Sequence, residues 1–293
     1  MDRIEALIQQ EVGRNIAKLF EAARGGLWGA ASALAAAPRL SVGLITGFYV
    51  PQGVPPAAET DGPVGASMLA TALQRIGAAC RVATDEACRA TCAAALQGTD
   101  VPMDVVPLGG TVEKTIAHWC GFGVTHAIAI ERCGRSADGA PRNMRGEDIS
   151  AFTQPLDDLF LAPWWQKIAI GDGGNEIGMG SLPASLIGAD VAHGERIACA
   201  TPAEHLVVSG VSNWGAYALI GALAVLRPDW QERLTQCLDP ERDAAVLRAC
   251  VNDGPAVDGV TRQRTLTVDS LPTEVHQEKL RAIRAVVEAH AAA

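Results

Sequence analysis

Two acidic side chains lie close together in the glycine-rich stretch Gly-Asp-Gly-Gly-Asn-Glu, residues 171–176. Asp172 follows an apolar run typical of a buried strand, and we expect Glu176 in the first turn of a helix. Both carboxylates would then face one cavity, where they could divide acid and base roles, bind a divalent cation such as Mg²⁺ or Mn²⁺, or hold an ammonium group. We also expect Asn175 to bind substrate. The structural alternative is capping of free helix N–H groups by Asp172 and Asn175.

A second group of polar residues lies in the long loop 46–63, between an apolar run and a predicted helix. Loops of this length are uncommon between closely spaced elements unless they are functional. Its prolines and glycines stiffen the backbone or let it approach a ligand. We expect Glu59 and Thr60 to bind substrate and Asp61 to act in catalysis, with a merely solvated connection as the alternative.

Several arginines gather in the loop 131–148. The planar guanidinium group matches a carboxylate with two parallel hydrogen bonds, which suits an amino-acid or oxo-acid substrate. Surface ion pairs with neighbouring acids are the alternative for each arginine. The residues of this loop that we expect to contact substrate are Glu131, Arg132, Asn143 and Arg145.

Ser212 and Asn213 precede an apolar stretch with the composition of a helix. N–H groups at a helix start can bind an anion or a developing oxyanion, so we expect both residues at the substrate. Ordinary capping is the alternative reading. The histidines form no cluster with a serine, which disfavours hydrolysis through a Ser–His pair.

Short apolar runs alternate along the chain with stretches of helical periodicity. This alternation predicts an α/β fold with a mainly parallel sheet flanked by helices, a Rossmann-like three-layer sandwich, to which a small helical subdomain could be added. The loops 46–63, 131–148, 171–178 and 209–213 all follow predicted strands, so we expect them at one edge of the sheet. The predicted strands are residues 42–45, 80–83, 103–106, 124–130, 167–170, 197–200 and 206–208.

The predicted helices complete one α/β domain over residues 1–293, with N-terminal helices in 1–38 and a catalytic core with C-terminal helices in 39–293. Apolar residues at helical spacing from Ile4 to Phe20 predict a first amphipathic helix. The others are an alanine-rich helix ending before Pro38, helices at 64–76, 86–96, 111–120 and 214–226, a helix within 149–165, and a last helix at 273–292.

The composition limits the class of partner. Lys and Arg number 24 against 33 Asp and Glu, a net charge of −9, which disfavours attraction to nucleic acid or anionic lipid. The start of the chain lacks the pattern of a secretory signal, and the eight cysteines contain no CxxC pair. We expect a soluble, cytoplasmic protein with a small-molecule substrate, and the sequence leaves homo-oligomerisation open.

Six blocks in this order resemble the D-glutamate cyclase C-terminal family, over about residues 20–290. The resemblance implies reversible cyclisation of D-glutamate to 5-oxo-D-proline with loss of water, a carbon–oxygen lyase reaction. The blocks are Thr-Gly-Phe (46–48), Pro-Pro-Ala-Ala-Glu-Thr-Asp-Gly-Pro (55–63), Glu-Arg (131–132), Asn-Met-Arg-Gly (143–146), Gly-Asp-Gly-Gly-Asn-Glu-Ile-Gly (171–178) and Ser-Asn-Trp-Gly (212–215).

For this reaction we assign roles as hypotheses. Asp172 or Glu176 would be the general base and Asp61 the acid. Arg145, with Arg132 as a second candidate, would hold the α-carboxylate. Backbone amides near Asn213 would bind the oxyanion.

Three alternatives stay open at this point. A divalent metal could act as a Lewis acid on the γ-carboxylate, with Asp172 and Glu176 as its ligands and Glu59 and Asp61 as further candidates. The protein could be a lyase or amidohydrolase for another small amino acid or lactam. It could also be a non-catalytic binding protein for an acidic metabolite.

Overall fold

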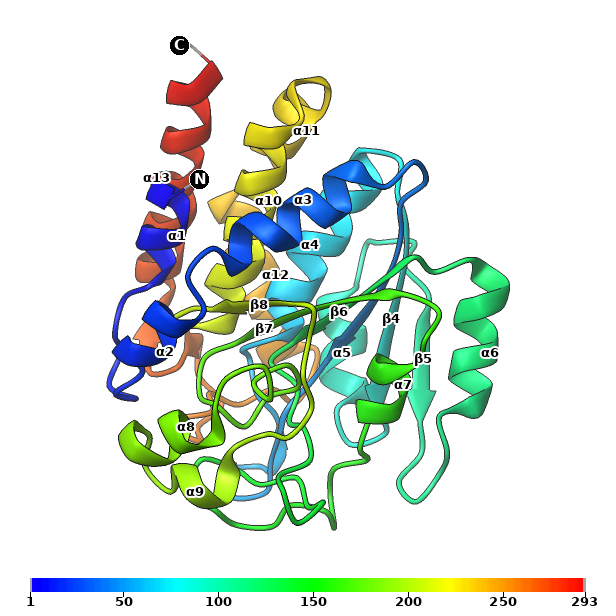
Figure 1. Cartoon of the computed structure of the whole chain (residues 1–293), viewed down its shortest axis with the longest axis vertical. Coiled ribbons are helices and arrows are strands. Elements are labelled where there is room, and N and C mark those ends of the chain that lie inside the picture. The colour runs from blue at the N-terminus through cyan, green and yellow to red at the C-terminus, as the bar shows by residue number, and fades with distance from the viewer. Residues whose placement is uncertain (1, 292–293) are drawn as a thin grey trace.

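A six-stranded parallel sheet forms the centre of the molecule (Figure 1). The structure is a computed structural model and describes residues 2–291. The strand order β5-β4-β1-β6-β7-β8 is the doubly wound order 3-2-1-4-5-6 when these strands are counted along the chain. The predicted parallel α/β class is therefore confirmed. The strands are β1 (Ser41–Thr46), β4 (Ala79–Asp85), β5 (Met103–Val106), β6 (His126–Ile130), β7 (Gln166–Gly171) and β8 (His205–Val208).

Side chains of each strand alternate between two cores, one on each face of the sheet. In β6, Ile128 and Ile130 point to one core while Ala127 and Ala129 point to the other. The isoleucine face packs against α1 (Asp2–Ile8), α3 (Gly26–Ala36), α4 (Pro63–Arg75), α5 (Arg89–Ala95), α10 (Ser212–Leu226), α11 (Pro228–Cys237), α12 (Pro240–Asn252) and α13 (Thr273–Ala291). The alanine face packs against α2 (Ala17–Ala22), α6 (Glu113–Phe122), α7 (Asp157–Leu161), α8 (Ala184–Asp190) and α9 (Gly194–Ile197).

The carboxyl ends of the strands carry the long loops. Successive strands are added on one side of β1 up to β5 and on its other side from β6 onward, so the strand order has its switch point between β1 and β6. At such a switch point the loops after the two strands diverge and leave a crevice for a ligand. The loop after β1 folds back as a small hairpin of β2 (Tyr49–Val50) and β3 (Ala57–Ala58).

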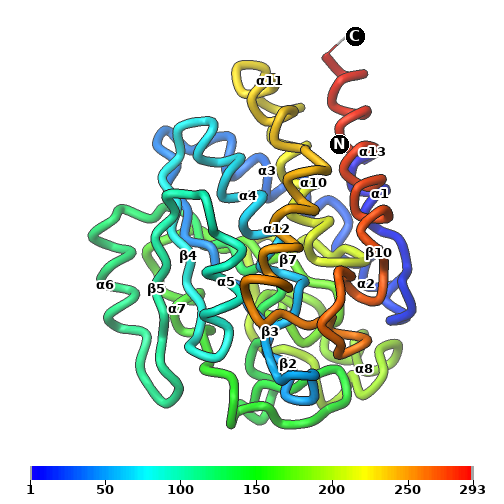
Figure 2. The backbone as a smooth tube through the Cα atoms, turned by 180° about the vertical axis from the view of Figure 1, so that it is seen from behind, coloured from blue at the N-terminus to red at the C-terminus, as the bar shows by residue number. Residues whose placement is uncertain are grey.

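A segment from near the C-terminus runs beside this hairpin (Figure 2), because Val54 pairs with Gln263 and Glu59 with Val257. This segment leads into the short antiparallel pair β9 (Thr267–Val268) and β10 (Leu271–Pro272).

Two predicted elements are wrong. The single helix from Ile4 to Phe20 is two helices, because Gly13 and Asn15 adopt positive φ angles of 104° and 60° and break the repeat between α1 and α2. The run 197–200 is not a strand. It starts at the last residue of α9, and its cysteine forms only an isolated bridge to Ser136.

The C-terminal helices do not form a separate unit, since α11, α12 and α13 share the apolar core of α4 and α10. The last predicted helix is observed as α13, and its final predicted residue, Ala292, lies outside the described residues. Within residues 2–291, no helix is long and apolar enough to cross a membrane.

A glycine substitution tests the packing of the alanine face. Gly43 of β1 lies under the indole ring of Trp119, and a Cβ atom there would lie 2.2 Å from the ring. We expect Gly43→Ala to lower the free energy of unfolding by about 1–3 kcal/mol in a denaturant titration. The control Gly121→Ala on α6, where nothing lies within 4 Å, should leave it unchanged or slightly higher. Equal stability of the two variants would contradict this packing.

Candidate active site

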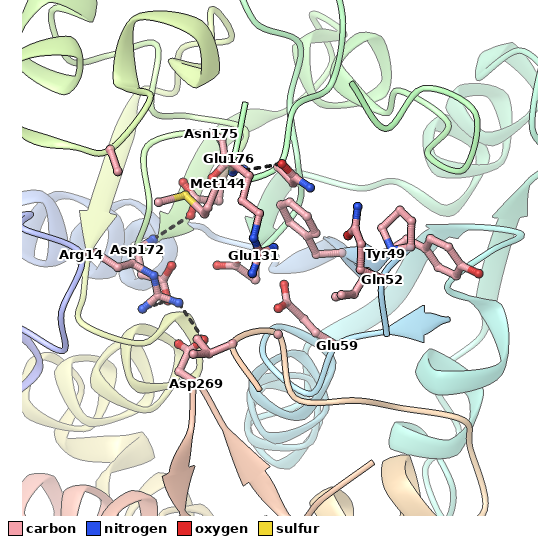
Figure 3. Close-up of a pocket in the computed structure, with 18 of the residues that line it drawn as sticks. Arg14, Tyr49, Gln52, Glu59, Glu131, Met144, Asp172, Asn175, Glu176 and Asp269 are labelled. Atoms are coloured by element: carbon pink, nitrogen blue, oxygen red, sulfur yellow. Dashed lines mark hydrogen bonds and ion pairs between the residues drawn. The ribbon is translucent and has the colours of Figure 1, made fainter. Parts of the chain in front are cut away.

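A cavity of about 290 Å³ lies at the carboxyl edge of the sheet (Figure 3). Its walls come from the N-terminal loop, from the loops after β1, β6 and β7, and from the segment before β10. This size suits a small metabolite. The charged residues in its wall are Glu59, Glu131, Asp172, Glu176, Asp269, Arg14 and Arg145.

Three buried carboxyl groups form the centre of the site. Asp61, Glu131 and Asp172 each bring one oxygen within 4.8 Å of the others, so the predicted meeting of these loops is observed. Glu131 and Asp172 line the cavity, while Asp61 lies behind them and does not. Three carboxylate oxygens in this arrangement could hold a metal ion.

The start of α10 stabilises this cluster. The backbone N–H of Ser212 donates to Asp61 Oδ2 at 2.9 Å and to Asp172 Oδ2 at 3.1 Å, and that of Asn213 donates to Asp61 Oδ1 at 2.8 Å. The Ser212 hydroxyl donates to Glu131 Oε2 at 2.6 Å. These N–H groups and the positive end of the helix dipole favour negative charge, so Asp61 caps the helix from another loop.

Burial raises the pKa of these acids. Burial, with the charge of Asp269, raises the pKa of Asp61 from 3.8 to about 7. Burial and neighbouring carboxylates also raise the pKa of Glu59 and of Glu131 well above the usual range. The pKa of Asp172 is raised well above its usual range by burial, although the charge of Arg14 opposes this rise. Asp61 can therefore exchange a proton near neutral pH, burial favours the protonated forms of Glu59 and Glu131, and at Asp172 burial and Arg14 act in opposite directions.

Arg14 is the only guanidinium among residues 2–291 that pairs with this acidic group. It lies 2.7 Å from Asp269 Oδ1 and 3.5 Å from Asp172 Oδ2, and it donates to the carbonyl of Gly210 at 3.1 Å. Glu11 holds the loop in place by accepting four successive backbone N–H groups, those of residues 13–16. The N-terminal loop thereby brings a positive charge to the acids at the carboxyl edge of the sheet.

Sequence reasoning missed Arg14 and Asp269. The sequence Gly13-Arg14-Asn15 was a usable signal, because glycine and asparagine are the residues that most easily end a helix in the left-handed region. For Asp269 no local pattern stood out, since it comes to the site only through the pairing of the C-terminal segment.

Glu176 differs from its predicted role. No helix begins there, since α8 starts at Ala184, and its carboxylate instead accepts the backbone N–H groups of Asp172, Gly173 and Gly174 at 3.2, 2.6 and 2.7 Å. These bonds hold the turn that carries Asp172. The acidic cluster with metal-ligand spacing contains Asp172 as predicted, but not Glu176.

Arg132 and Thr60 do not line the cavity. The Arg132 guanidinium is fully buried, where it donates to the Gly47 carbonyl at 2.6 Å and to Asp85 Oδ2 at 2.7 Å. Thr60 is also buried and donates its hydroxyl to the carbonyl of Thr267 at 2.9 Å. Each side chain is already satisfied within the fold and lies outside the cavity wall, so neither has a place in the site proposed below.

The backbone amides near Asn213, which we expected to bind an oxyanion, have partners within the protein. The backbone N–H of Asn213 and that of Ser212 already donate to aspartates. The Asn213 side chain is occupied as well, since its Oδ1 accepts the N–H groups of Gly62 at 3.0 Å and Gly65 at 2.7 Å, at the start of α4. Asn213 of α10 thus caps the start of α4, and Asp61, from the loop before α4, caps the start of α10.

Three further predicted residues lie at the cavity wall: Asn143, Asn175 and Arg145. Asn143 accepts the N–H of Arg145 at 3.0 Å and so shapes its turn, while Asn175 donates to the carbonyl of Arg142 at 2.7 Å. The guanidinium of Arg145 is exposed and has no ion pair with any residue in 2–291. It is therefore free to bind an anionic ligand.

Fold and site together define a doubly wound α/β protein with an acidic cavity for a small ligand at its switch point. The profile of the family described as D-glutamate cyclase-like, C-terminal, matches residues 4–284. The chain belongs to this family. A human protein named D-glutamate cyclase, mitochondrial, is 38% identical over 204 residues, which is 64% of this chain and 33% of that protein. The match thus spans about a third of the length of this relative.

The raised pKa of Asp61 predicts a pH effect on stability. Because its folded pKa of about 7 exceeds the ordinary value of 3.8, the stabilisation is present below pH 3.8 and is lost as pH rises through about 7. Asp61→Asn cannot ionise, so its free energy of unfolding should fall less over this window than that of the wild-type protein. Denaturant titrations at a series of pH values measure this. Parallel pH curves for the two proteins would rule out a raised pKa at Asp61.

Proposed function

We propose that this protein is an enzyme that interconverts D-glutamate and 5-oxo-D-proline, a carbon–oxygen lyase. The observation that carries the proposal is the buried group of Asp61, Glu131 and Asp172 at the cavity, which offers proton-exchanging acids to an amino group. Membership of the D-glutamate cyclase-like family and the name of the human relative support the same reaction.

The reaction is a proton-balanced ring closure. The α-nitrogen of D-glutamate forms a bond to the γ-carboxyl carbon, and one carbon–oxygen bond of that carboxyl group breaks. The ammonium group loses two protons, and the departing oxygen takes up two protons and leaves as water. A base at the nitrogen and an acid at the oxygen are therefore needed, and the enzyme ends the cycle in its starting protonation state.

The acids of the cavity can take these two roles. Asp172 is the base, because the Arg14 guanidinium, 3.5 Å away, favours its ionised form and so opposes the effect of burial. Glu131 is the acid, because burial and surrounding carboxylates raise its pKa and keep it protonated. Glu59 lies across the cavity from Arg14 (Figure 3) and provides a second protonated group for the tetrahedral oxyanion. Asp61 holds Asp172 in place through the shared N–H group of Ser212.

The cavity also supplies orientation. Attacking nitrogen and target carbon belong to one molecule, so the protein has only to hold the chain of D-glutamate in its folded, ring-like form. The small volume of the cavity favours such a compact conformer over an extended one. Arg145 anchors the ligand through its carboxylate.

A second candidate role of the acidic cluster is the binding of Mg²⁺ or Mn²⁺. Asp61, Glu131 and Asp172 would be the ligands, because hard divalent cations prefer carboxylate oxygens at this spacing. A metal here would supply Lewis-acid polarisation of the γ-carboxylate.

Metal binding can be tested without an activity assay. If the cluster binds a cation, millimolar Mn²⁺ or Mg²⁺ should raise the unfolding temperature of the wild-type protein and not that of Glu131→Gln, which loses one ligand. An equal response of both proteins, or none, would remove the metal from the proposal.

We also propose a cytoplasmic protein without a nucleic-acid or membrane partner. The net charge of −9 supports this, since it disfavours both kinds of anionic surface. The human relative is mitochondrial by name, so imaging of the tagged full-length chain in its own cell decides the location.

Replacement of the base tests the proposed reaction. Asp172→Asn should lower turnover of D-glutamate by about 10²–10⁴-fold, because proton transfer from the nitrogen loses its acceptor. Chiral chromatography of D-glutamate and 5-oxo-D-proline measures the rate. The control Glu288→Gln, on the exposed face of α13, should keep the wild-type rate. A wild-type rate for Asp172→Asn would remove this residue from the mechanism, and stabilisation by ligand without any turnover would favour a binding protein.

A further inference from the structure

Asp269 is an acid of the cavity wall that the proposed reaction leaves unused. It is only 4% exposed, and its Oδ1 forms an ion pair with Arg14 at 2.7 Å. Its Oδ2 is buried and accepts no hydrogen bond from any residue in 2–291. A buried carboxylate oxygen without a donor is unfavourable, because it has lost its water and gained no partner. A donor on a ligand in the cavity would satisfy this oxygen.

A tight hairpin turn holds Asp269 at the cavity. Strands β9 and β10 pair Val268 with Leu271, so Asp269 and Ser270 are the two residues of the turn. Both have positive φ angles, 53° and 65°, the combination found in type I′ turns. The N–H of Ser270 donates to Asp258 Oδ2 at 2.7 Å, and Asp258 is fully buried. The position of Asp269 is therefore fixed by the fold itself.

One guanidinium is shared by two carboxylates at this wall. The two terminal nitrogens of Arg14 contact Asp269 Oδ1 at 2.7 Å and Asp172 Oδ2 at 3.5 Å (Figure 3). Within residues 2–291, no other cationic side chain forms an ion pair with either acid. When Asp172 is ionised, as a general base must be, one positive charge stands against two negative charges. A cation bound beside both acids would balance the excess.

We propose that Asp269 binds the α-ammonium group of D-glutamate and holds it at Asp172. This inference rests on the proposed function for the identity of the ligand. Both acids contact the terminal nitrogens of one guanidinium, so they lie side by side at the cavity wall. An ammonium group has three N–H donors, and it can donate to Asp269 Oδ2 and to Asp172 at the same time.

This arrangement keeps the charge of the site balanced during proton transfer. Bound D-glutamate adds one positive charge to Arg14, Asp172 and Asp269, which makes the set neutral. When an N–H bond of the ammonium breaks and Asp172 takes up the proton, the amine and Asp172 become neutral, and Arg14 and Asp269 remain an ion pair. The nitrogen of the lactam product is neutral and cannot form an ion pair with Asp269. The residue therefore distinguishes the open substrate from the cyclic product.

Two ligands that cannot form a lactam isolate the ammonium contact. D-homocysteate is D-glutamate with a sulfonate in place of the γ-carboxylate, and 4-sulfobutanoate is the same molecule without the amino group. We expect the wild-type protein to bind D-homocysteate more tightly in isothermal titrations at pH 7. Asp269→Asn should reduce the ratio of the two affinities by about 10–100-fold, the loss of one charge-assisted contact.

The substitution spares the turn. Asparagine adopts positive φ readily, and its amide oxygen can still accept a hydrogen bond from Arg14. Asp269→Gly, for which positive φ has no steric cost, removes the side chain altogether and should show the same fall in the ratio. Retained binding of 4-sulfobutanoate identifies a folded variant. A parallel loss of both ligands would mean that Asp269 only shapes the site, and would overturn the inference.

The matched control is Glu274→Gln, in the first turn of α13. Glu274 is exposed, so the substitution removes the same charge from the C-terminal segment without touching the cavity wall. This control should keep the wild-type ratio of affinities. An equal fall in Glu274→Gln and Asp269→Asn would reduce the effect to long-range charge and overturn the ammonium contact. A wild-type protein that binds both ligands equally would overturn it as well.

Turnover separates this inference from the proposed function, because neither probe reacts. If the wild-type protein cyclises D-glutamate and Asp269→Asn keeps the wild-type ratio, the ammonium contact is wrong and the function stands. If the wild-type protein shows the preference for D-homocysteate and Asp269→Asn loses it, but D-glutamate is not turned over, the proposed reaction fails and the ammonium contact stands.

Discussion

The burial of several carboxyl groups beside one another is the constraint on which the site depends. Like charges this close cannot all ionise, and each costs free energy to remove from water. Two features offset this cost: the first N–H groups of α10, which donate hydrogen bonds to Asp61 and Asp172, and the guanidinium of Arg14. Glu59 and Glu131, whose pKa values are raised by burial and by neighbouring carboxylates, keep their protons. The interactions that offset the cost of burial therefore also favour the ionised form of Asp172 over that of Glu131.

The doubly wound sheet explains why these groups meet. Acids after β1, β6 and β7 reach one place because the carboxyl ends of parallel strands share an edge, and the switch between β1 and β6 leaves room for a ligand. The segments that complete the cavity come from outside the sheet. The N-terminal loop brings Arg14 and the C-terminal segment brings Asp269, so both add charges to a site whose central acids come from the loops after β1, β6 and β7.

Local sequence patterns predicted the sheet well, because buried strands and the helices between them have distinct periodicities. They also predicted that Asp61, Glu131 and Asp172 would meet, since each follows a strand.

Local sequence patterns failed where a side chain has a partner far away in the sequence. Arg132 looked like a ligand-binding residue, but Asp85 pairs with it inside the fold. Glu176 looked like a second catalytic acid, but its carboxylate closes its own turn. Arg14 and Asp269 escaped notice because only tertiary packing places them at the site.

The central claim is that one small ligand lies in this cavity between Arg145 and the acids Asp172 and Glu131. A crystal structure of the protein with bound 5-oxo-D-proline tests it most directly. We predict the lactam N–H and carbonyl toward Asp172 and Glu131, and the carboxylate within hydrogen-bond distance of Arg145. A lactam bound in the reverse orientation, with its carboxylate against Asp172 and Glu131, would contradict the account. So would a lactam bound outside this cavity.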